Sequence, residues 1–112
     1  LPPLAVERGD MLELLGNLLD NACKWAAGEV RLALARDGGL LTVTVDDDGP
    51  GIPPSRREQV LQRGRRLDER VAGDGLGLAI VSDTVAAYGG QLTLTDSPLG
   101  GLRVRLALPL PD

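Results

Sequence analysis

The sequence predicts an α+β fold, a two-layer α/β sandwich in which helices cover one face of a mixed, mostly antiparallel sheet. Residues 11–26 and 76–88 carry apolar side chains at helical spacing. Two further regions, 29–46 and 91–108, alternate between apolar and polar residues around glycine-containing turns. Antiparallel strands with one apolar face need helices to cover that face, which gives the two layers.

Length and composition limit the possible functions. The chain has 112 residues, 43% of them hydrophobic, so we expect one globular domain spanning residues 1–112. The net charge of −4 argues against a nucleic-acid partner. Histidine is absent, which excludes histidine-based catalysis within the chain. The first residue is not Met, so we expect a fragment of a longer protein. No apolar run in the sequence is long enough to cross a bilayer.

The first predicted helix, residues 11–26, has an unusual polar stripe. Its expected apolar face consists of Met11, Leu12, Leu15, Leu18, Leu19, Ala22 and Ala26. Opposite them lie Glu13, Asn17, Asp20, Asn21 and Lys24. Asn is a poor helix former, so two Asn residues one turn apart indicate either a binding site or a solvated face that tolerates them.

The first hairpin is predicted from strands at 29–36 and 40–46, and three acids follow its apolar alternation. Strand parity places Asp47 on the helix-facing side and directs Asp46 and Asp48 toward solvent. An inward carboxylate is unfavourable unless a donor, such as the amino group of a base, pairs with it. Gly49 and Gly51 would let a flat ligand approach the backbone. The alternative is a simple turn built from Asp, Gly and Pro.

The middle of the chain contains a short helix at 55–62 and then an irregular, arginine-rich segment at 63–75. Long irregular segments in small domains are usually functional or disordered. Arg65, Arg66 and Arg70 would suit a lid over phosphates, because a guanidinium matches two phosphate oxygens at once. The alternative is a solvated charged loop.

A glycine-rich stretch, 73–77, leads into the second long helix at 76–88. Main-chain N–H groups at the start of a helix can bind an anion. The spacing fits neither the dinucleotide fingerprint nor the P-loop, so this is a phosphate loop of another type or a flexible hinge. A second hairpin, with strands at 91–95 and 102–108, completes the chain.

Three motifs in this order give the chain a family resemblance. The run NLLDNACKW at 17–25 resembles the N-box of the GHKL ATP-binding superfamily, DDGPGI at 47–52 resembles its G1 box, and GDGLGL at 73–78 resembles its G2 box. Within that superfamily the chain looks most similar to the catalytic, ATP-binding domain of a bacterial sensor histidine kinase of the PhoQ type. The resemblance implies the Bergerat fold, with ATP and Mg²⁺ as ligands.

The resemblance also implies roles for individual residues. Asn21 would be the Mg²⁺ ligand, Asn17 would assist it through water or a neighbouring contact, and Lys24 would neutralise phosphate charge. Asp47 would accept a hydrogen bond from the adenine amino group, and Arg66 would reach the terminal phosphate. The implied catalytic residues are Asn17, Lys24 and Arg66. The implied nucleotide-binding residues are Asn17, Asn21, Lys24, Trp25, Asp47, Gly49, Gly51, Ile52, Arg66, Gly73, Gly75, Leu76, Gly77 and Leu78.

By the same resemblance, the chain would donate the γ-phosphate of ATP to a histidine on a separate dimerisation domain of the same protein. A response regulator would act downstream, the parent would be a homodimer in the bacterial inner membrane, and this domain would be cytoplasmic. The family's F-box phenylalanine is replaced by Leu61, which puts docking of the lid in doubt. The alternatives are a GHKL ATPase, an anti-sigma-type serine kinase and a nucleotide-binding module without transfer activity.

Overall fold

A computed structural model describes residues 8–61 and 76–109, and for residues 76 and 77 it describes the main chain alone. The elements follow the predicted order. They are α1 (Arg8–Trp25), β1 (Val30–Asp37), β2 (Leu40–Asp47), α2 (Pro54–Leu61), α3 (Leu76–Ala87), β3 (Gln91–Asp96) and β4 (Leu102–Pro109). Within these ranges, no helix combines the length and apolar character needed to cross a membrane.

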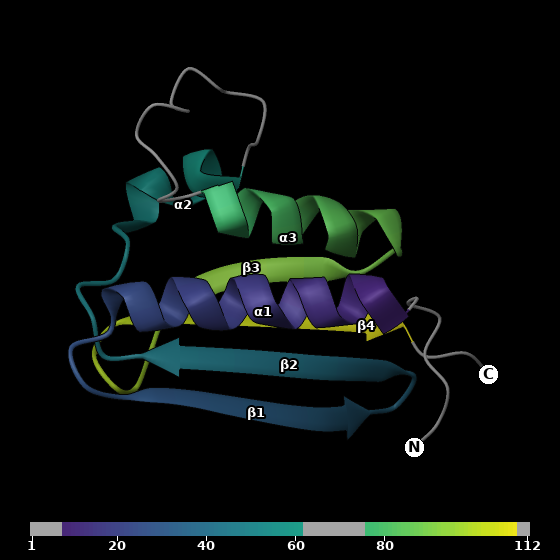
Figure 1. Cartoon of the computed structure of the whole chain (residues 1–112), viewed down its shortest axis with the longest axis horizontal. Coiled ribbons are helices and arrows are strands. Elements are labelled where there is room, and N and C mark those ends of the chain that lie inside the picture. The colour runs from purple at the N-terminus through teal and green to yellow at the C-terminus, as the bar shows by residue number, and fades with distance from the viewer. Residues whose placement is uncertain (1–7, 62–75, 110–112) are drawn as a thin grey trace.

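The four described strands form one sheet in the order β1-β2-β4-β3 (Figure 1). The hairpins β1–β2 and β3–β4 are those predicted, and β2 pairs with β4 at the centre. Every described pairing is antiparallel: each hairpin pairs its own two strands in this way, and so do β2 and β4, which join the hairpins. The expectation of a mixed sheet therefore does not hold for the described strands, whereas the predicted two-layer α+β fold is confirmed.

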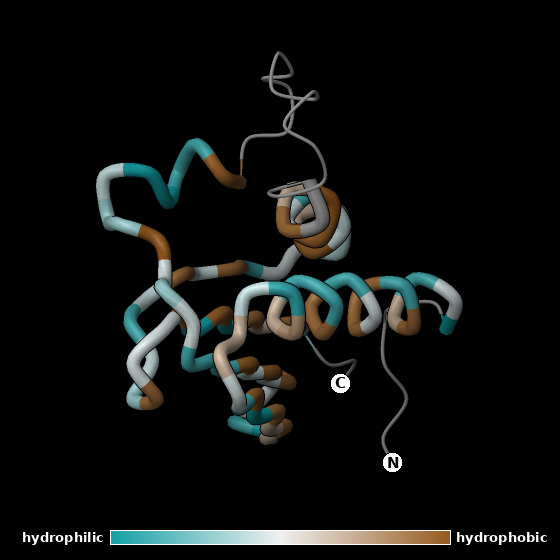
Figure 2. The backbone as a smooth tube through the Cα atoms, turned by 60° about the vertical axis from the view of Figure 1, so that its left-hand side comes forward, coloured by the Kyte–Doolittle hydropathy of each residue, from teal (hydrophilic) through white to brown (hydrophobic). Residues whose placement is uncertain are grey.

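Helices α1 and α3 lie side by side over one face of the sheet (Figure 1). Helix α1 turns its apolar side toward the strands and its polar side away from them (Figure 2). Burial of aliphatic side chains between these layers provides most of the driving force for folding. The buried core consists of Leu14, Leu18, Ala22, Val43, Val45, Leu78, Val81, Val85, Leu94, Leu102, Val104, Leu106 and Leu108.

The buried face of α1 is turned relative to the predicted stripe, because the helix packs against both β2 and α3. Its buried residues are Leu14, Leu18, Asn21 and Ala22. Leu12, expected on the apolar face, is 62% exposed, and Asn21, expected on the opposite face, is only 8% exposed. The polar stripe therefore divides into two parts, since Glu13 and Asp20 face solvent while Asn21 points into the interior.

Strand β1 differs from the expectation that its apolar side is covered. It is an edge strand, and α1 packs over its neighbour β2. Leu32 and Leu34 are consequently exposed by 44% and 59%, although they stand opposite the buried Val45 and Val43. Alternation identified the correct face of β1, but burial of that face depends on where the helix lies.

Candidate nucleotide-binding site

Most of the predicted site residues that the structure describes lie toward one end of the molecule. The C-terminal end of α1, the C-terminal end of β2, the first turn of α3 and the connection between β3 and β4 all meet there (Figure 1). Two of these elements carry the side chains singled out by sequence, Asn21 on α1 and Asp47 on β2. Segments far apart in sequence therefore meet where a ligand was predicted to bind.

Asp47 is the most deeply buried acid of this end, with 3% of its surface exposed. Its Oδ1 accepts hydrogen bonds from the main-chain N–H groups of Gly49 and Leu102, at 2.9 Å and 3.2 Å. Among the described residues, no donor lies within hydrogen-bond distance of Oδ2. Main-chain donors thus hold one oxygen of the carboxylate, and the other is available to an incoming donor. The inward orientation predicted for Asp47 is confirmed.

The backbone around Asp47 is packed so closely that glycine is required. A Cβ atom at Gly49 would lie 2.2 Å from the carbonyl oxygen of Trp25, at the end of α1. One at Gly101 would lie 2.3 Å from Asp47 Oδ1. Gly51 adopts a φ of 73°, which favours glycine over residues with a side chain. These contacts join the end of β2 to α1 on one side and to β4 on the other.

Asn21 is a buried amide with no hydrogen-bond partner among the described residues. Its side chain makes no hydrogen bond to any described residue, and it lies next to the core residues Leu18 and Ala22. An unsatisfied buried amide costs roughly 1–3 kcal/mol, so such a group is retained where a ligand satisfies it. Asn17, one turn earlier on α1, is half-buried. Both residues fit the predicted polar site.

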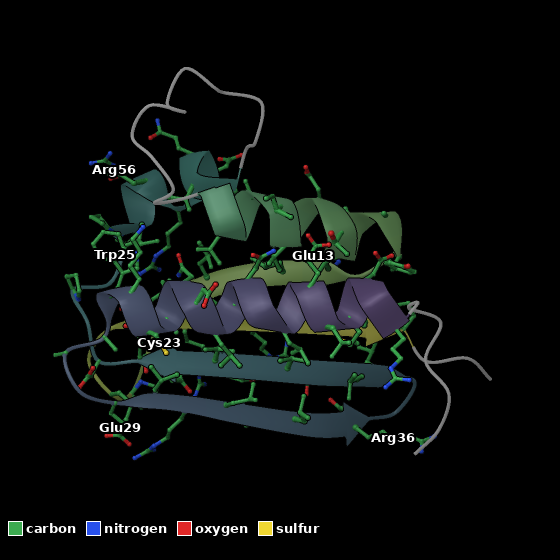
Figure 3. All side chains as sticks on the ribbon, viewed as in Figure 1. Glu13, Cys23, Trp25, Glu29, Arg36 and Arg56 are labelled. Atoms are coloured by element: carbon green, nitrogen blue, oxygen red, sulfur yellow. The ribbon has the colours of Figure 1, made fainter. Side chains whose placement is uncertain are left out.

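Lys24 and Trp25 end α1 at the rim of this region. The Lys24 ammonium lies 5.8 Å from the centre of the Trp25 ring, within the range of a cation–π contact. Trp25 is 41% exposed and lies at the same end of the molecule as Arg56 (Figure 3). Ile52 is half-buried and packs against the core. The Trp25 ring is therefore accessible for stacking on a flat ligand.

The remaining predicted residues lie in or before α3. The side chain of Leu78 is buried in the core, so a contact with a ligand could come only from its main chain. Leu76 and Gly77 form the first turn of α3, as the predicted anion-binding helix start requires. Arg66, Gly73 and Gly75 lie outside the described residues, and their roles stay predictions.

Asp46 was expected to point into solvent, and it is 6% exposed instead. It lies on the sheet face opposite the helices, where Arg103 Nε and Nη2 donate to its two oxygens at 2.8 Å and 3.1 Å. This bidentate contact lowers the pKa of Asp46 below its ordinary 3.8, and the Ser97 hydroxyl lowers it further. A partner 57 residues away explains the burial, and strand parity gave no indication of it.

Asp48 also has a structural role. Its carboxylate accepts hydrogen bonds from the N–H groups of Ala27 and Gly28, at 2.7 Å and 3.0 Å. The hydrogen bond from Gly28 is the main reason that the pKa of Asp48 lies below 3.8. Asp48 thereby ties the loop between α1 and β1 to the end of β2. The three consecutive acids thus bind different groups, and Asp47 is the one that faces the helices with an oxygen that no described residue contacts as a donor.

The Asp46–Arg103 pair should make the fold sensitive to acid. The folded-state pKa of Asp46 lies below its unfolded value, so its stabilisation is complete above pH 3.8 and is lost as pH falls through the folded pKa. We expect Asp46→Ala to lower the free energy of unfolding at pH 7, because the hydrogen-bonded ion pair is lost. The loss should be only about 1–2 kcal/mol, because Arg103 is partly solvated. We also expect the variant to lose part of the acid dependence, as measured by urea unfolding between pH 2 and pH 7. Arg105→Ala on the same strand is the control, and an unchanged slope in Asp46→Ala would contradict the assignment.

Two residues that hold Asp47 were not recognised in the sequence. Gly101 donates its N–H to the Asp47 carbonyl at 3.1 Å, and Leu102 donates to the carboxylate. In the sequence, Gly101 ends a predicted hairpin turn and Leu102 begins a predicted strand, and neither pattern predicts a contact with Asp47. A second adjacent glycine at the end of that turn was the available signal, since only a close approach requires glycine there.

Comparison with known proteins agrees with this geometry. "Sensor protein kinase CarS" of Pseudomonas aeruginosa is 62% identical over 104 residues, which cover 93% of this chain and 23% of CarS. "Virulence sensor histidine kinase PhoQ" of Salmonella typhimurium is 42% identical over 100 residues, covering 89% of this chain and 20% of PhoQ. The chain thus spans less than a quarter of the length of these relatives.

The fold is shared with a solved structure of ShkA, full-length and in complex with AMPPNP. That structure superimposes with a TM-score of 0.80 at 34% identity, covering 100% of this chain and 24% of ShkA. Residues 7–112 match the family described as histidine kinase-, DNA gyrase B-, and HSP90-like ATPases. The match covers nearly the whole chain and agrees with the predicted GHKL resemblance. The chain therefore belongs to the family of histidine kinase-, DNA gyrase B- and HSP90-like ATPases, as an ATP-binding domain similar to those of PhoQ-like sensor kinases.

Proposed function

We propose that this chain binds ATP with Mg²⁺ and donates the γ-phosphate to a histidine on a dimerisation domain of the same protein. The observation that carries the proposal is the buried Asp47, whose one oxygen is held by the main chain and whose other oxygen has no partner among the described residues. A buried carboxylate in this state favours a ligand that brings its own donor. The amino group of adenine is such a donor, whereas guanine has a carbonyl at that position.

The triphosphate would extend from Asp47 toward α1 and the first turn of α3. Lys24 would neutralise phosphate charge, and the main-chain N–H groups near Gly75 and Gly77 would bind phosphate oxygens. Gly73, Leu76 and Leu78 belong to the same stretch. Arg66 would contact the terminal phosphate, and Trp25 would pack on the base or the ribose beside Gly49, Gly51 and Ile52. Phosphoryl transfer needs positioning and charge neutralisation more than covalent help, and this set of residues supplies both.

The Asn21 amide, for which residues 8–61 and 76–109 supply no hydrogen-bond partner, fits a Mg²⁺ ion. Carbonyl oxygens suit this ion, which usually keeps several waters and substrate phosphates among its ligands. The described residues contain no group of three or more His, Cys, Asp or Glu side chains that could hold a metal by themselves. Asn21 would therefore be a protein ligand alongside phosphate oxygens and water, with Asn17 assisting. Bound Mg²⁺ would neutralise the charge of the triphosphate.

Asn21→Ala should remove the Mg²⁺ dependence of ATP binding. The wild-type chain should bind ATP more tightly with Mg²⁺ than with a chelator, and in the variant the two affinities should converge, because the protein no longer contacts the ion. Alanine favours the helix, so α1 should be retained. Isothermal titration calorimetry with and without Mg²⁺ measures the effect. The exposed neighbour Asp20→Ala is the control, and an unchanged metal dependence in Asn21→Ala would rule out the metal role.

A GHKL-type ATPase is the second candidate. In such enzymes a glutamate one turn before the metal-binding Asn activates water, and the corresponding residue here is Asn17, whose amide cannot act as a base. Glu13 lies a further turn away and faces solvent (Figure 3). Rapid hydrolysis is therefore disfavoured. The anti-sigma-type serine kinases share these motifs and differ in their acceptor.

A phosphotransfer assay tests the proposal. The chain is incubated with γ-labelled ATP, Mg²⁺ and a separately produced dimerisation domain that carries the acceptor histidine. We expect label on that domain, and none when its histidine is replaced or when Asp47→Asn is used. Release of free phosphate alone would favour the ATPase, label on serine would favour a serine kinase, and no turnover would favour a nucleotide-binding module. A cognate response regulator, a homodimeric parent and its location in the inner membrane are further parts of the same proposal.

A further inference from the structure

Asp47 is also held from the start of β4 and the residue that precedes it. The pairing of β2 with β4 ends at Asp46 opposite Arg103. The N–H of Leu102, one residue before Arg103 on β4, donates to Asp47 Oδ1. The preceding N–H, that of Gly101, donates to the Asp47 carbonyl oxygen at 3.1 Å. The segment Gly101–Leu102 thus contacts both the backbone and the side chain of Asp47.

These hydrogen bonds constrain how the carboxylate can turn. The Gly49 N–H, two residues after Asp47, and the Leu102 N–H, 55 residues after it, donate to the same oxygen. Rotation of the carboxylate would break both bonds, and because Asp47 is only 3% exposed, a hydrogen bond lost there is poorly replaced by water. Oδ1 is therefore fixed as the structural oxygen, and Oδ2 is presented to the ligand.

Gly101 leaves the space that this arrangement needs. A Cβ atom on residue 101 would lie 2.3 Å from Asp47 Oδ1, 2.6 Å from the Asp47 carbonyl oxygen and 2.6 Å from the Gly49 nitrogen. Two of these neighbours are backbone atoms, so a methyl group cannot be accommodated by moving a side-chain tip. The added carbon would displace the carboxylate, the turn after β2, or both.

On the basis of the adenine-binding role proposed for Asp47, we infer that Gly101 and the Leu102 N–H are positioning residues that set selectivity for the 6-amino group of the base. Presence of the carboxylate alone is then insufficient for selectivity. The oxygen that makes no hydrogen bond to the main chain must also be oriented toward the base, and Gly101 and Leu102 fix that orientation. Residues 101 and 102 act through Asp47 and need not touch the nucleotide.

The test compares ATP with purine riboside triphosphate, which has the same ring system without the 6-amino group. The wild-type chain should bind ATP more tightly, and the ratio of the two dissociation constants should fall about tenfold in Gly101→Ala, the value of one hydrogen bond to a charged group. Inorganic tripolyphosphate with Mg²⁺, which lacks the base, should bind the wild type and Gly101→Ala equally. Because only the base-dependent ratio moves, general destabilisation cannot produce this pattern.

Two control variants separate positioning from stability. In Gly90→Ala, the Cβ would lie 2.4 Å from the Ala107 carbonyl oxygen, so the variant suffers a comparable clash with β4 away from Asp47. It should lose stability and keep the wild-type ratio. Gly39→Ala adds the same methyl group in open space and should also keep the ratio. A wild-type ratio in folded Gly101→Ala, or an equal loss in Gly90→Ala, would overturn the inference.

A measurement on the wild-type chain keeps the inference testable if Gly101→Ala does not fold. In ¹⁵N-resolved NMR spectra, ATP should shift the amide resonances of Leu102 and Gly49 more than purine riboside triphosphate does. Equal shifts would overturn the inference. If Asp47→Asn binds ATP as the wild type does, the proposed function itself fails. If Asp47→Asn loses binding while Gly101→Ala keeps the ratio, only the positioning role fails.

Discussion

Asp47→Asn should weaken ATP binding by about 2–3 kcal/mol, on the order of 100-fold, while the fold remains intact. The fold survives because the asparagine carbonyl oxygen can still accept from the Gly49 and Leu102 N–H groups, as Asp47 Oδ1 does. The amide –NH₂ then occupies the position of Oδ2 and directs a donor at the donor group of adenine. ATP binding weakens because the asparagine –NH₂ and the adenine amino group, both donors, face each other in a buried site.

The same reversal predicts altered base selectivity. Inosine triphosphate has a carbonyl where adenine has its amino group, so the Asp47→Asn variant should bind inosine triphosphate better than ATP. Calorimetric titration with both nucleotides measures the two affinities. Asp37→Asn, the same chemical change at the far end of the β1–β2 hairpin, is the control and should leave both unchanged. Normal ATP affinity in Asp47→Asn would refute the adenine-binding assignment.

The elements of this fold could be predicted from sequence because their patterns are local. Helical spacing at 11–26 and 76–88 and alternation at 29–46 and 91–108 gave α1, α3 and both hairpins, with ends within three residues of those observed. Strand parity also oriented Asp47 correctly, since parity depends only on the strand that carries the residue. Each of these inferences needed no knowledge of how the elements pack.

Features that depend on packing between distant segments could not be predicted in this way. Burial of Asp46 results from Arg103, 57 residues later, and the carboxylate of Asp47 is held by Leu102, 55 residues later. Exposure of Leu34 follows from the edge position of β1, which is a property of the whole sheet. Asn21 was identified as a site residue, yet its burial became evident only once α1 was packed against both β2 and α3.

Gly49→Ala should reduce both stability and ATP binding. The new Cβ would lie 2.2 Å from the Trp25 carbonyl oxygen and 2.8 Å from its carbonyl carbon. These atoms belong to the end of α1, where the Ala26 N–H still donates to the Ala22 carbonyl, so they cannot rotate away. Overpacking of this kind costs about 1–3 kcal/mol in the free energy of unfolding. Chemical denaturation measures the stability, and calorimetry measures the affinity for ATP.

The expected loss of binding in Gly49→Ala has a geometric cause that the controls can isolate. The clash must move the turn after β2 away from α1, which breaks the hydrogen bond from Gly49 N–H to Asp47 Oδ1 and separates Asp47 from Asn21. Gly39→Ala adds the same methyl group in open space and should change neither quantity by more than about 0.5 kcal/mol. Gly90→Ala should lose stability without losing affinity, because its clash lies between α3 and β4, away from the turn after β2. If Gly49→Ala binds ATP normally, the contact between the end of α1 and the turn after β2 does not position Asp47 relative to Asn21. Both variants place a methyl group against backbone atoms, but only that of Gly49→Ala lies beside Asp47. If Gly90→Ala loses as much affinity as Gly49→Ala, the loss of affinity therefore follows from reduced stability alone.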